Sequence, residues 1–290
     1  MKPSLPARLL FCLFLLLPAA AIARPALWVV KDADTTIYLF GTVHLLPNDT
    51  AWHYPVLDRA VADSGTLYIE ITDDNPANML GLVLRYGMDY AHPLSSLLSE
   101  SEMLRLNAAA NKAGVPGGAQ RLVSMKPWLA ALTIAIAPLR KAGLDPEHGV
   151  DKLLKAQMTD GGKQVLGLET SEQQIRFLAD MPQTLQLALL RSTLREFDRA
   201  TIQLNQLIEA WKAGDVDTIA RVEDEEMRQK EPKLYQRLLV QRNEDWAARI
   251  GDLLRNHSGT IFIAVGAAHL AGPDSVQAQL HKLGIEAARQ

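Results

Sequence analysis

The chain has 290 residues, of which 48% are hydrophobic and 6% aromatic, and its formal net charge is −3. A weakly acidic protein without basic runs is poorly suited to coat nucleic acid or anionic lipid, so we expect no nucleic-acid partner.

The first 23 residues are typical of a secretory signal peptide. A basic start precedes a continuous apolar run at residues 9–17 (LLFCLFLLL), and residues 21–23 (AIA) offer a small-x-small cleavage site. An uncleaved anchor is the alternative, but the run is shorter than the roughly 20 residues that a spanning helix requires. We therefore expect a periplasmic or secreted protein that begins near Arg24, without stable membrane insertion. Cleavage would also remove Cys12, the only cysteine, and with it any thiol chemistry.

Strands and helices are predicted along the mature chain from hydrophobic periodicity and from start and stop signals. Helical patterns dominate the middle of the chain, between strands near its two ends. Strands are predicted at residues 26–31, 35–40, 66–71, 163–168 and 260–265. Helices are predicted at residues 55–62, from Ser99 toward Gly114, at 128–139, 145–161, after Thr170, and at 182–212, 233–255 and 273–282.

This order favours an α/β (α+β) fold with a central mixed β-sheet and flanking helices. The helical middle, roughly residues 95–255, would be a large insertion in a single domain that spans residues 24–290. Residues 128–139 are apolar all round and too short to cross a membrane, so they predict a buried core helix.

Two segments share a pattern in which a hydrophobic strand stops at a glycine and a histidine follows three residues later. IYLFGTVH contains Gly41 and His44, and IFIAVGAAH contains Gly266 and His269. Glycine permits a sharp turn through positive φ, or a close approach of backbone. Ligands bind at the carboxyl ends of strands in open α/β sheets, so neighbouring parallel strands would bring both imidazoles to one pocket. The alternative is a pair of unrelated loop histidines.

Two carboxylates occupy similar positions, because Glu70 lies near the end of the strand LYIEI and Glu169 follows VLGL. A carboxylate in an apolar strand is costly unless it is paired, hydrogen-bonded or bound to a metal. A salt bridge to a core arginine is an alternative for each, and Glu169 also fits an acidic helix start. Two neutral imidazoles with one or two carboxylates form a ligand set suited to Zn²⁺, Mn²⁺, Fe²⁺ or Co²⁺.

Other catalytic patterns are missing from the sequence. It contains no G-x-S-x-G nucleophile elbow, P-loop, G-x-G-x-x-G fingerprint or HExxH segment. The remaining histidines lie beside polar residues and are interpreted as surface or local hydrogen-bonding groups: His53, His92, His148, His257 and His281.

Taken together, these segments resemble the TraB/GumN (PrgY) family, which includes the animal Tiki proteins. The order and spacing of the matching segments agree through most of the mature chain. One departure is Ala268, which replaces the inner glycine of the Gly-x-Gly-His motif common in bacterial relatives and predicts a slightly stiffer turn. The matching segments are YLFGTVHLLP, the strand glutamate Glu70, KPW, GVDKLL, GLETSEQQ, RNEDWAARI and VGAAHLAGPDSV.

The resemblance implies a metal-dependent hydrolase, because Tiki proteins look like metal-dependent peptidases that favour Mn²⁺ or Co²⁺. By motif position, His44, Glu70 and His269 become the metal-site residues for Mn, Co or Zn. Glu70 would be a ligand or the base that takes a proton from metal-bound water. The expected substrate is a peptide or another small molecule of the cell envelope.

Three further residues receive roles through the same resemblance. Arg242 would reach the pocket and bind substrate or stabilise an oxyanion, and an ordinary surface helix is the alternative. Asn243 would bind substrate or support the site beside it, and Glu169 would orient a histidine. A non-catalytic envelope protein that binds peptide or exopolysaccharide in the same pocket is the second hypothesis. A hydrolase of small esters or phosphoesters is the third.

Overall fold

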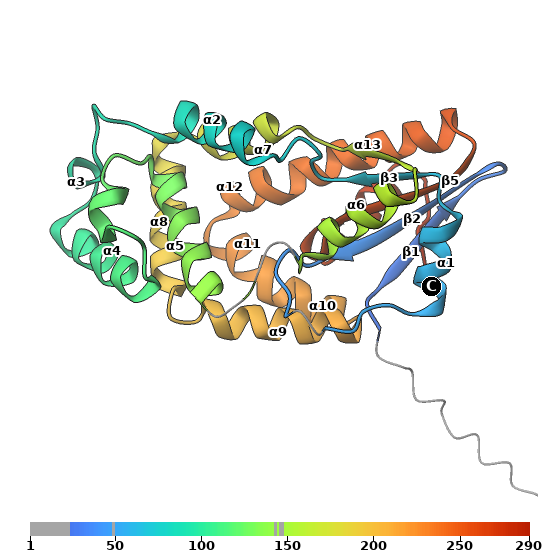
Figure 1. The fold of residues 1–290 in the computed structure, drawn as a ribbon, viewed down its shortest axis with the longest axis horizontal. Coiled ribbons are helices and arrows are strands. Elements are labelled where there is room, and N and C mark those ends of the chain that lie inside the picture. Colours follow the sequence, from blue (N-terminus) through green and yellow to red (C-terminus); the bar gives the residue numbers. More distant parts are fainter. Residues whose placement is uncertain (1–23, 48–49, 142–143, 145–147) are drawn as a thin grey trace, which may run out of the picture.

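A computed structural model describes residues 24–47, 50–141, 144 and 148–290 (Figure 1). The predicted signal peptide lies outside these residues, as do Asp145 and Pro146, which the sequence predicts to open a helix. Within the described ranges, no helix combines the length and the apolarity that crossing a lipid bilayer requires.

A six-stranded sheet forms the centre of the fold, in the order β4-β3-β5-β2-β1-β6. The first four of these strands are parallel, whereas β1 runs antiparallel to both β2 and β6. The predicted mixed sheet with flanking helices is thus confirmed. The strands are β1 (Leu27–Lys31), β2 (Thr35–Thr42), β3 (Thr66–Ile69), β4 (Gln164–Gly167), β5 (Gly259–Gly266) and β6 (Ala288–Arg289).

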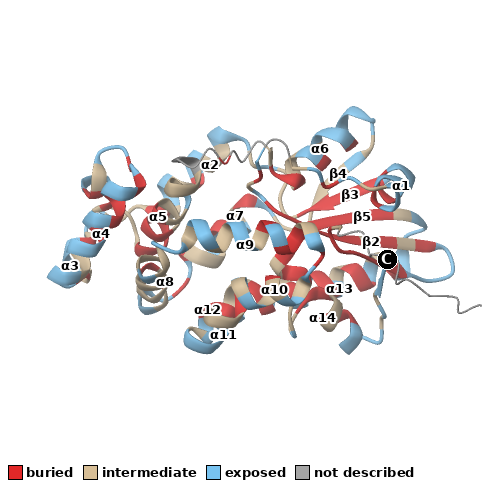
Figure 2. Ribbon diagram, turned by 90° about the horizontal axis from the view of Figure 1, so that it is seen from below, coloured by how far each residue is buried: buried red, intermediate tan, exposed pale blue. Residues whose placement is uncertain are grey.

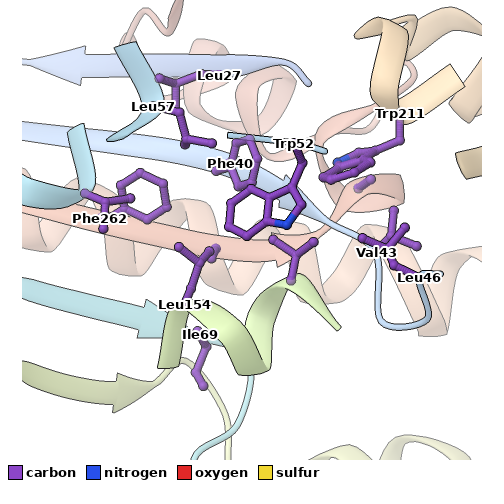
Figure 3. Close-up of a cluster of buried hydrophobic side chains, with 14 of the residues drawn as sticks. Leu27, Phe40, Val43, Leu46, Trp52, Leu57, Ile69, Leu154, Trp211 and Phe262 are labelled. Carbon is purple, nitrogen blue, oxygen red and sulfur yellow. The ribbon is translucent and has the colours of Figure 1, made fainter. Parts of the chain in front are cut away.

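Helices cover both faces of the sheet, because successive strand residues point to opposite sides. On one face, α1 (Pro55–Asp63), α6 (Val150–Asp160) and α9 (Ala200–Ala213) pack against Phe40 and Phe262 in an aromatic-rich core (Figure 3). On the other face, Leu39 and Ile263 contact α13 (Gln241–Asn256) and α14 (Val276–Lys282). The central strands are therefore buried between two layers of helices (Figure 2).

The other large helices form a lobe beyond the carboxyl ends of the parallel strands, at the left of Figure 1. This lobe has hydrophobic clusters of its own. The predicted capping pairs Ser99/Glu102 and Thr170/Gln173 are present at the starts of two of its helices. The helices of the lobe are α2 (Pro76–Gly87), α3 (Leu94–Leu97), α4 (Glu100–Ala113), α5 (Pro127–Lys141), α7 (Ser171–Ala179) and α8 (Gln183–Glu196).

Two long predicted helices are interrupted in the structure. Residues 182–212 form α8 and α9, because α8 buries Leu190 in the lobe whereas α9 buries Trp211 against the sheet. One straight helix cannot serve both cores. Residues 233–255 contain α12 (Pro232–Tyr235), the π-helical turn η4 (Gln236–Val240) and α13. Three shorter segments lie between α9 and α12, namely α10 (Val216–Ala220), the π-helical turn η3 (Arg221–Glu225) and α11 (Glu226–Lys230).

Trp211 ties α9 to the end of β2. Its Nε1 donates a hydrogen bond of 2.7 Å to the carbonyl oxygen of Gly41, and its ring packs edge-on against Phe40. The side chain is almost fully buried. Helix α9 thereby covers the strand end from which the first histidine motif continues.

We predict that Trp211→Phe lowers the free energy of unfolding by about 1–3 kcal/mol more than Trp128→Phe does, as measured by urea denaturation. Both tryptophans are fully buried, but the Nε1 of Trp128 has no hydrogen-bond partner among the described residues. The first substitution strands a carbonyl oxygen, whereas the second loses ring volume alone. Equal losses would contradict a stabilising Trp211–Gly41 bond.

Candidate active site

Four ionisable side chains follow the ends of four neighbouring parallel strands. In sheet order, Glu169 follows β4, Glu70 follows β3, His269 lies beyond β5 and His44 lies beyond β2. Parallel strands end at one edge of a sheet, so residues far apart in sequence meet there. The last three of these side chains line one cavity of about 280 Å³.

The two glycine turns lie side by side, because Gly41 is opposite Val265 and Gly266 is opposite Thr42 in the β2–β5 pair. A Cβ on Gly41 would lie 3.0 Å from the Cα of Ala267, so this close packing needs a glycine. Neither motif glycine has a positive φ. The sharp left-handed turn predicted as one reason for glycine is therefore wrong, and at Gly41 the close approach of the Ala267 backbone is the physical reason.

Arg242 on α13 joins three of the four ionisable side chains. Its Nε and Nη2 donate to the two carboxylate oxygens of Glu169, both at 2.9 Å, and Nη2 also donates to Glu70 Oε2 at 2.6 Å. Its Nη1 lies 3.1 Å from His269 Nε2. The side chain is only 12% exposed, so it is no surface residue. Both carboxylates thus form salt bridges with a core arginine, the alternative that the sequence left open.

His269 is held as a neutral ring in a defined tautomer. Its Nδ1 lies 2.6 Å from Asn243 Oδ1, and the amide nitrogen of Asn243 donates to the carbonyl of Asp274. The Asn243 oxygen must therefore accept from Nδ1–H, which leaves Nε2 with a lone pair. Burial, together with the charge of Arg242, lowers the pKa of His269 to about 3.

His44 stands at the open side of the cavity, with 57% of its side chain exposed. Its Nδ1 lies 3.1 Å from Asp151 Oδ1 on α6. Desolvation opposes the charged ring, but the hydrogen bond and charge of Asp151, with the charge of Glu70, outweigh it and raise the pKa of His44 to about 9. In contrast to His269, this ring is protonated near neutral pH.

Helix α6 begins directly against the first histidine motif. The N–H of Val150 donates to the carbonyl of Val43, and a Cβ on Gly149 would lie only 2.7 Å from the carbonyl oxygen of His44. A glycine is therefore required for α6 to approach closely enough to carry Asp151 to the imidazole.

Glu70 is buried and ionised. The N–H of Gly266 donates to its Oε1 at 2.8 Å, and Gln174 donates to its Oε2 at the same distance. Burial raises the pKa of Glu70, but Arg242 and the Gly266 N–H outweigh it and bring the value to about 2. Burial raises the pKa of Glu169, against the opposing effect of Arg242.

The Arg242 guanidinium contacts both His269 Nε2 and Glu70 Oε2, two of the atoms predicted to hold a metal ion. In the described part of the chain, no three His, Cys, Asp or Glu side chains are grouped so that they could hold a metal ion. By donor type the residues nevertheless fit, because each histidine engages an oxygen through Nδ1, and Nε2 would bind an ion once His44 loses its proton and Arg242 leaves His269. A Cβ on Gly266 would lie 3.2 Å from Glu70 Oε1 and 3.6 Å from His44 Nε2, so the glycine leaves space beside two of the donors.

Three side chains at the site were not predicted from the sequence. Asp151 and Gln174 lie in GVDKLL and GLETSEQQ, so the family motifs contained a signal that was not used. Glu223 on η3 lines the cavity with the two histidines, and nothing in the sequence distinguishes it from other acidic helix residues. Away from the site, three predicted local histidines pair with nearby carboxylates: His53 with Asp58, His92 with Asp89 and His281 with Glu286.

Comparison with known proteins identifies relatives along the whole described domain. The model of the TraB/PrgY/gumN family matches residues 26–289. The uncharacterized protein YbaP of Escherichia coli (strain K12) is 26% identical over 261 residues, which cover 88% of this chain and 92% of YbaP. Metalloprotease TIKI2 of Danio rerio is 25% identical over 313 residues, which cover 90% of this chain and 60% of TIKI2. No solved structure matches.

We predict that Asp151→Asn lowers the pKa of His44 from about 9 toward 6.5, as measured by NMR titration of the imidazole. The folded state raises this pKa, so the pair stabilises the fold fully below pH 6.5 and loses its effect as pH rises through about 9. The stability difference between wild type and variant should shrink across that window. Asp58→Asn, which removes the partner of His53, is the control. An unchanged His44 pKa in Asp151→Asn would show that Asp151 is not the cause.

We also predict that Gly149→Ala separates α6 from the His44 backbone and lowers the His44 pKa. The added methyl group overpacks the contact, at a cost of about 1–3 kcal/mol in urea denaturation. Gly65→Ala is the matched control, because a Cβ there meets nothing within 4 Å. Similar pKa values and stabilities for the two variants would refute the close-approach argument.

Proposed function

The chain belongs to the TraB/PrgY/gumN family, and we propose that it is an exported, metal-dependent hydrolase of a peptide or related amide. One observation carries the proposal: two histidines, each oriented through Nδ1, line one cavity with an ionised glutamate at the ends of parallel strands. The similarity to a protein named as a metalloprotease supports the same reaction class.

In this proposal, His44 and His269 would hold a divalent ion through Nε2, and Glu70 would be a further ligand or the base beside the ion. Mn²⁺, Co²⁺ and Zn²⁺ all suit such ligands. When bound, the ion lowers the pKa of a water molecule and polarises the scissile carbonyl. Arg242 would compete with the ion for the same ligand atoms, because its guanidinium already contacts His269 Nε2 and Glu70 Oε2.

The neighbouring residues orient and charge these groups. Asp151 and Asn243 fix the planes of the two rings, as second-sphere partners of metal-binding histidines commonly do. Because the pKa of His44 is about 9, this ring must release a proton before it can ligate, so metal affinity rises with pH.

Glu70 is ionised and can accept a proton from the attacking water, as a weak base because its pKa is about 2. The new C–O bond forms as the amide C–N bond breaks, and the proton passes to the leaving amine. Arg242 carries positive charge beside this carboxylate, where it can stabilise the negative charge that develops on the carbonyl oxygen.

A binding protein without turnover is the second candidate. It is favoured by the contact of Arg242 with His269 Nε2, which satisfies the imidazole without any ion. Such a protein would hold a peptide or glycan in the same cavity. In either case we propose that residues 1–23 direct export, which places the site in the periplasm or outside the cell.

The two candidates differ in turnover, and metal content tests the site on which the hydrolase depends. After dialysis against Mn²⁺, Co²⁺ or Zn²⁺, we expect about one ion per wild-type chain by mass spectrometry, and loss of that ion in His44→Ala and His269→Ala. His281→Ala, which alters an exposed histidine paired with Glu286, should keep the ion.

The variants that lose the ion, His44→Ala and His269→Ala, should also lose cleavage of a peptide library. His281→Ala should retain cleavage. Equal metal in all four proteins would end the metal-site proposal. Metal binding and peptide binding without cleavage, under any of the three ions, would favour the binding protein.

A further inference from the structure

A second cavity opens on the lobe side of the Glu70–Arg242 pair. This lobe cavity has a volume of about 370 Å³. Its polar lining residues are Glu70, Gln174 and Arg242, which belong to the candidate active site. Its apolar lining comes from four elements of the chain, through Met79 on α2, Trp128 and Leu132 on α5, Ile175 and Phe177 on α7, and Leu238 on η4.

The apolar wall is part of the lobe's own core. Trp128 and Ile175 are buried members of one hydrophobic cluster, and Met79 and Leu132 pack against it while remaining half-buried. Half-buried apolar side chains around a cavity lack partner atoms on one side and so forgo dispersion contacts. An apolar group that entered would gain about 25 cal/mol for each Å² removed from water. The size and the mixture of many apolar groups with few polar ones are typical of ligand pockets.

The lobe cavity differs in chemistry from a third cavity, which is also lined by Glu70. That neighbouring cavity, of about 220 Å³, is lined by Asp74, Asp151, Lys152 and Lys155, and also contains His44. Gln174 lines both cavities and donates to Glu70 Oε2, so it stands between them. Of these two cavities, the lobe cavity is the one that favours a large apolar side chain, because a charged side chain would lose its hydration there without an ionic partner of its own.

We propose that the lobe cavity is a specificity pocket that receives a large, uncharged apolar side chain, such as leucine, methionine or phenylalanine, from the residue next to the reacting amide. The substrate backbone then lies at Glu70 and Arg242, which border both the lobe cavity and the cavity with the two histidines. This inference rests on the proposed function and assigns its substrate class.

The first test profiles cleavage of a peptide library by the metal-loaded protein. Wild type should prefer a large apolar residue beside the cleaved bond. Leu132→Trp fills the pocket and should shift the ratio of kcat/KM for phenylalanine over alanine substrates by at least about tenfold toward alanine. Met79→Trp fills it from another helix and serves if the first variant does not fold. Leu80→Trp, at an exposed position on α2, is the control and should keep the wild-type preference.

The second test requires no turnover. Binding of N-acetyl-phenylalaninamide and N-acetylglycinamide to the full protein is measured by protein-observed NMR, with metal content determined in parallel. We expect the phenylalanine amide to bind at least about tenfold more tightly, and Leu132→Trp and Met79→Trp to remove this difference while Leu80→Trp retains it.

Together, the two tests distinguish failure of the pocket proposal from failure of the hydrolase proposal. A retained difference between the amides, without cleavage of any peptide, supports the pocket and rejects the hydrolase. Equal binding of the two amides by wild type overturns the pocket, whatever the metal content shows. An unchanged cleavage preference in both pocket-filling variants overturns it as well.

Discussion

The buried guanidinium of Arg242 is the interaction on which the rest of the site depends. A cation with 12% exposure must be paired and hydrogen-bonded, and here two glutamates and a neutral imidazole provide the partners. Each partner follows a different strand of the sheet. The arginine itself comes from α13, which packs on one face of that sheet. Removing the guanidinium would leave two carboxylates close together in a poorly solvated pocket.

The ionisable groups around Arg242 and the nearby His44 differ in protonation state. Glu70 stays ionised and His269 stays neutral, while the more exposed His44 is charged by its bond to Asp151. Strongly shifted pKa values among neighbouring groups are typical of functional sites. It also means that a divalent ion must compete with two charges already in place, a proton on His44 and the guanidinium of Arg242. In the proposed metal site, affinity for the ion would therefore depend on pH and on the position of α13.

The helical lobe adds what the strand ends alone do not provide. The sheet edge supplies the ionisable groups, and the lobe faces Glu70 with apolar side chains from α2, α5 and α7. Gln174 belongs to the lobe yet hydrogen-bonds Glu70, so the two parts are joined at the carboxylate. A site built in this way can place the reacting group and the selecting surface on separate scaffolds. In the proposed pocket, change at Met79 or Leu132 would alter selectivity, whereas change at Gln174 would also affect Glu70.

The sequence by itself determined the features that depend on local chemistry. Strands, the capping pairs at Ser99 and Thr170, and the motif histidines after Gly41 and Gly266 follow from periodicity and neighbouring residues. Tertiary structure alone decided the strand order, the pairing of Arg242 with both glutamates, and the approach of Asp151 to His44. It also decided where the helix predicted at 182–212 must break. These outcomes arise from contacts between residues far apart in sequence, such as Arg242 and Glu70, which are 172 positions apart, and no local pattern contains their geometry.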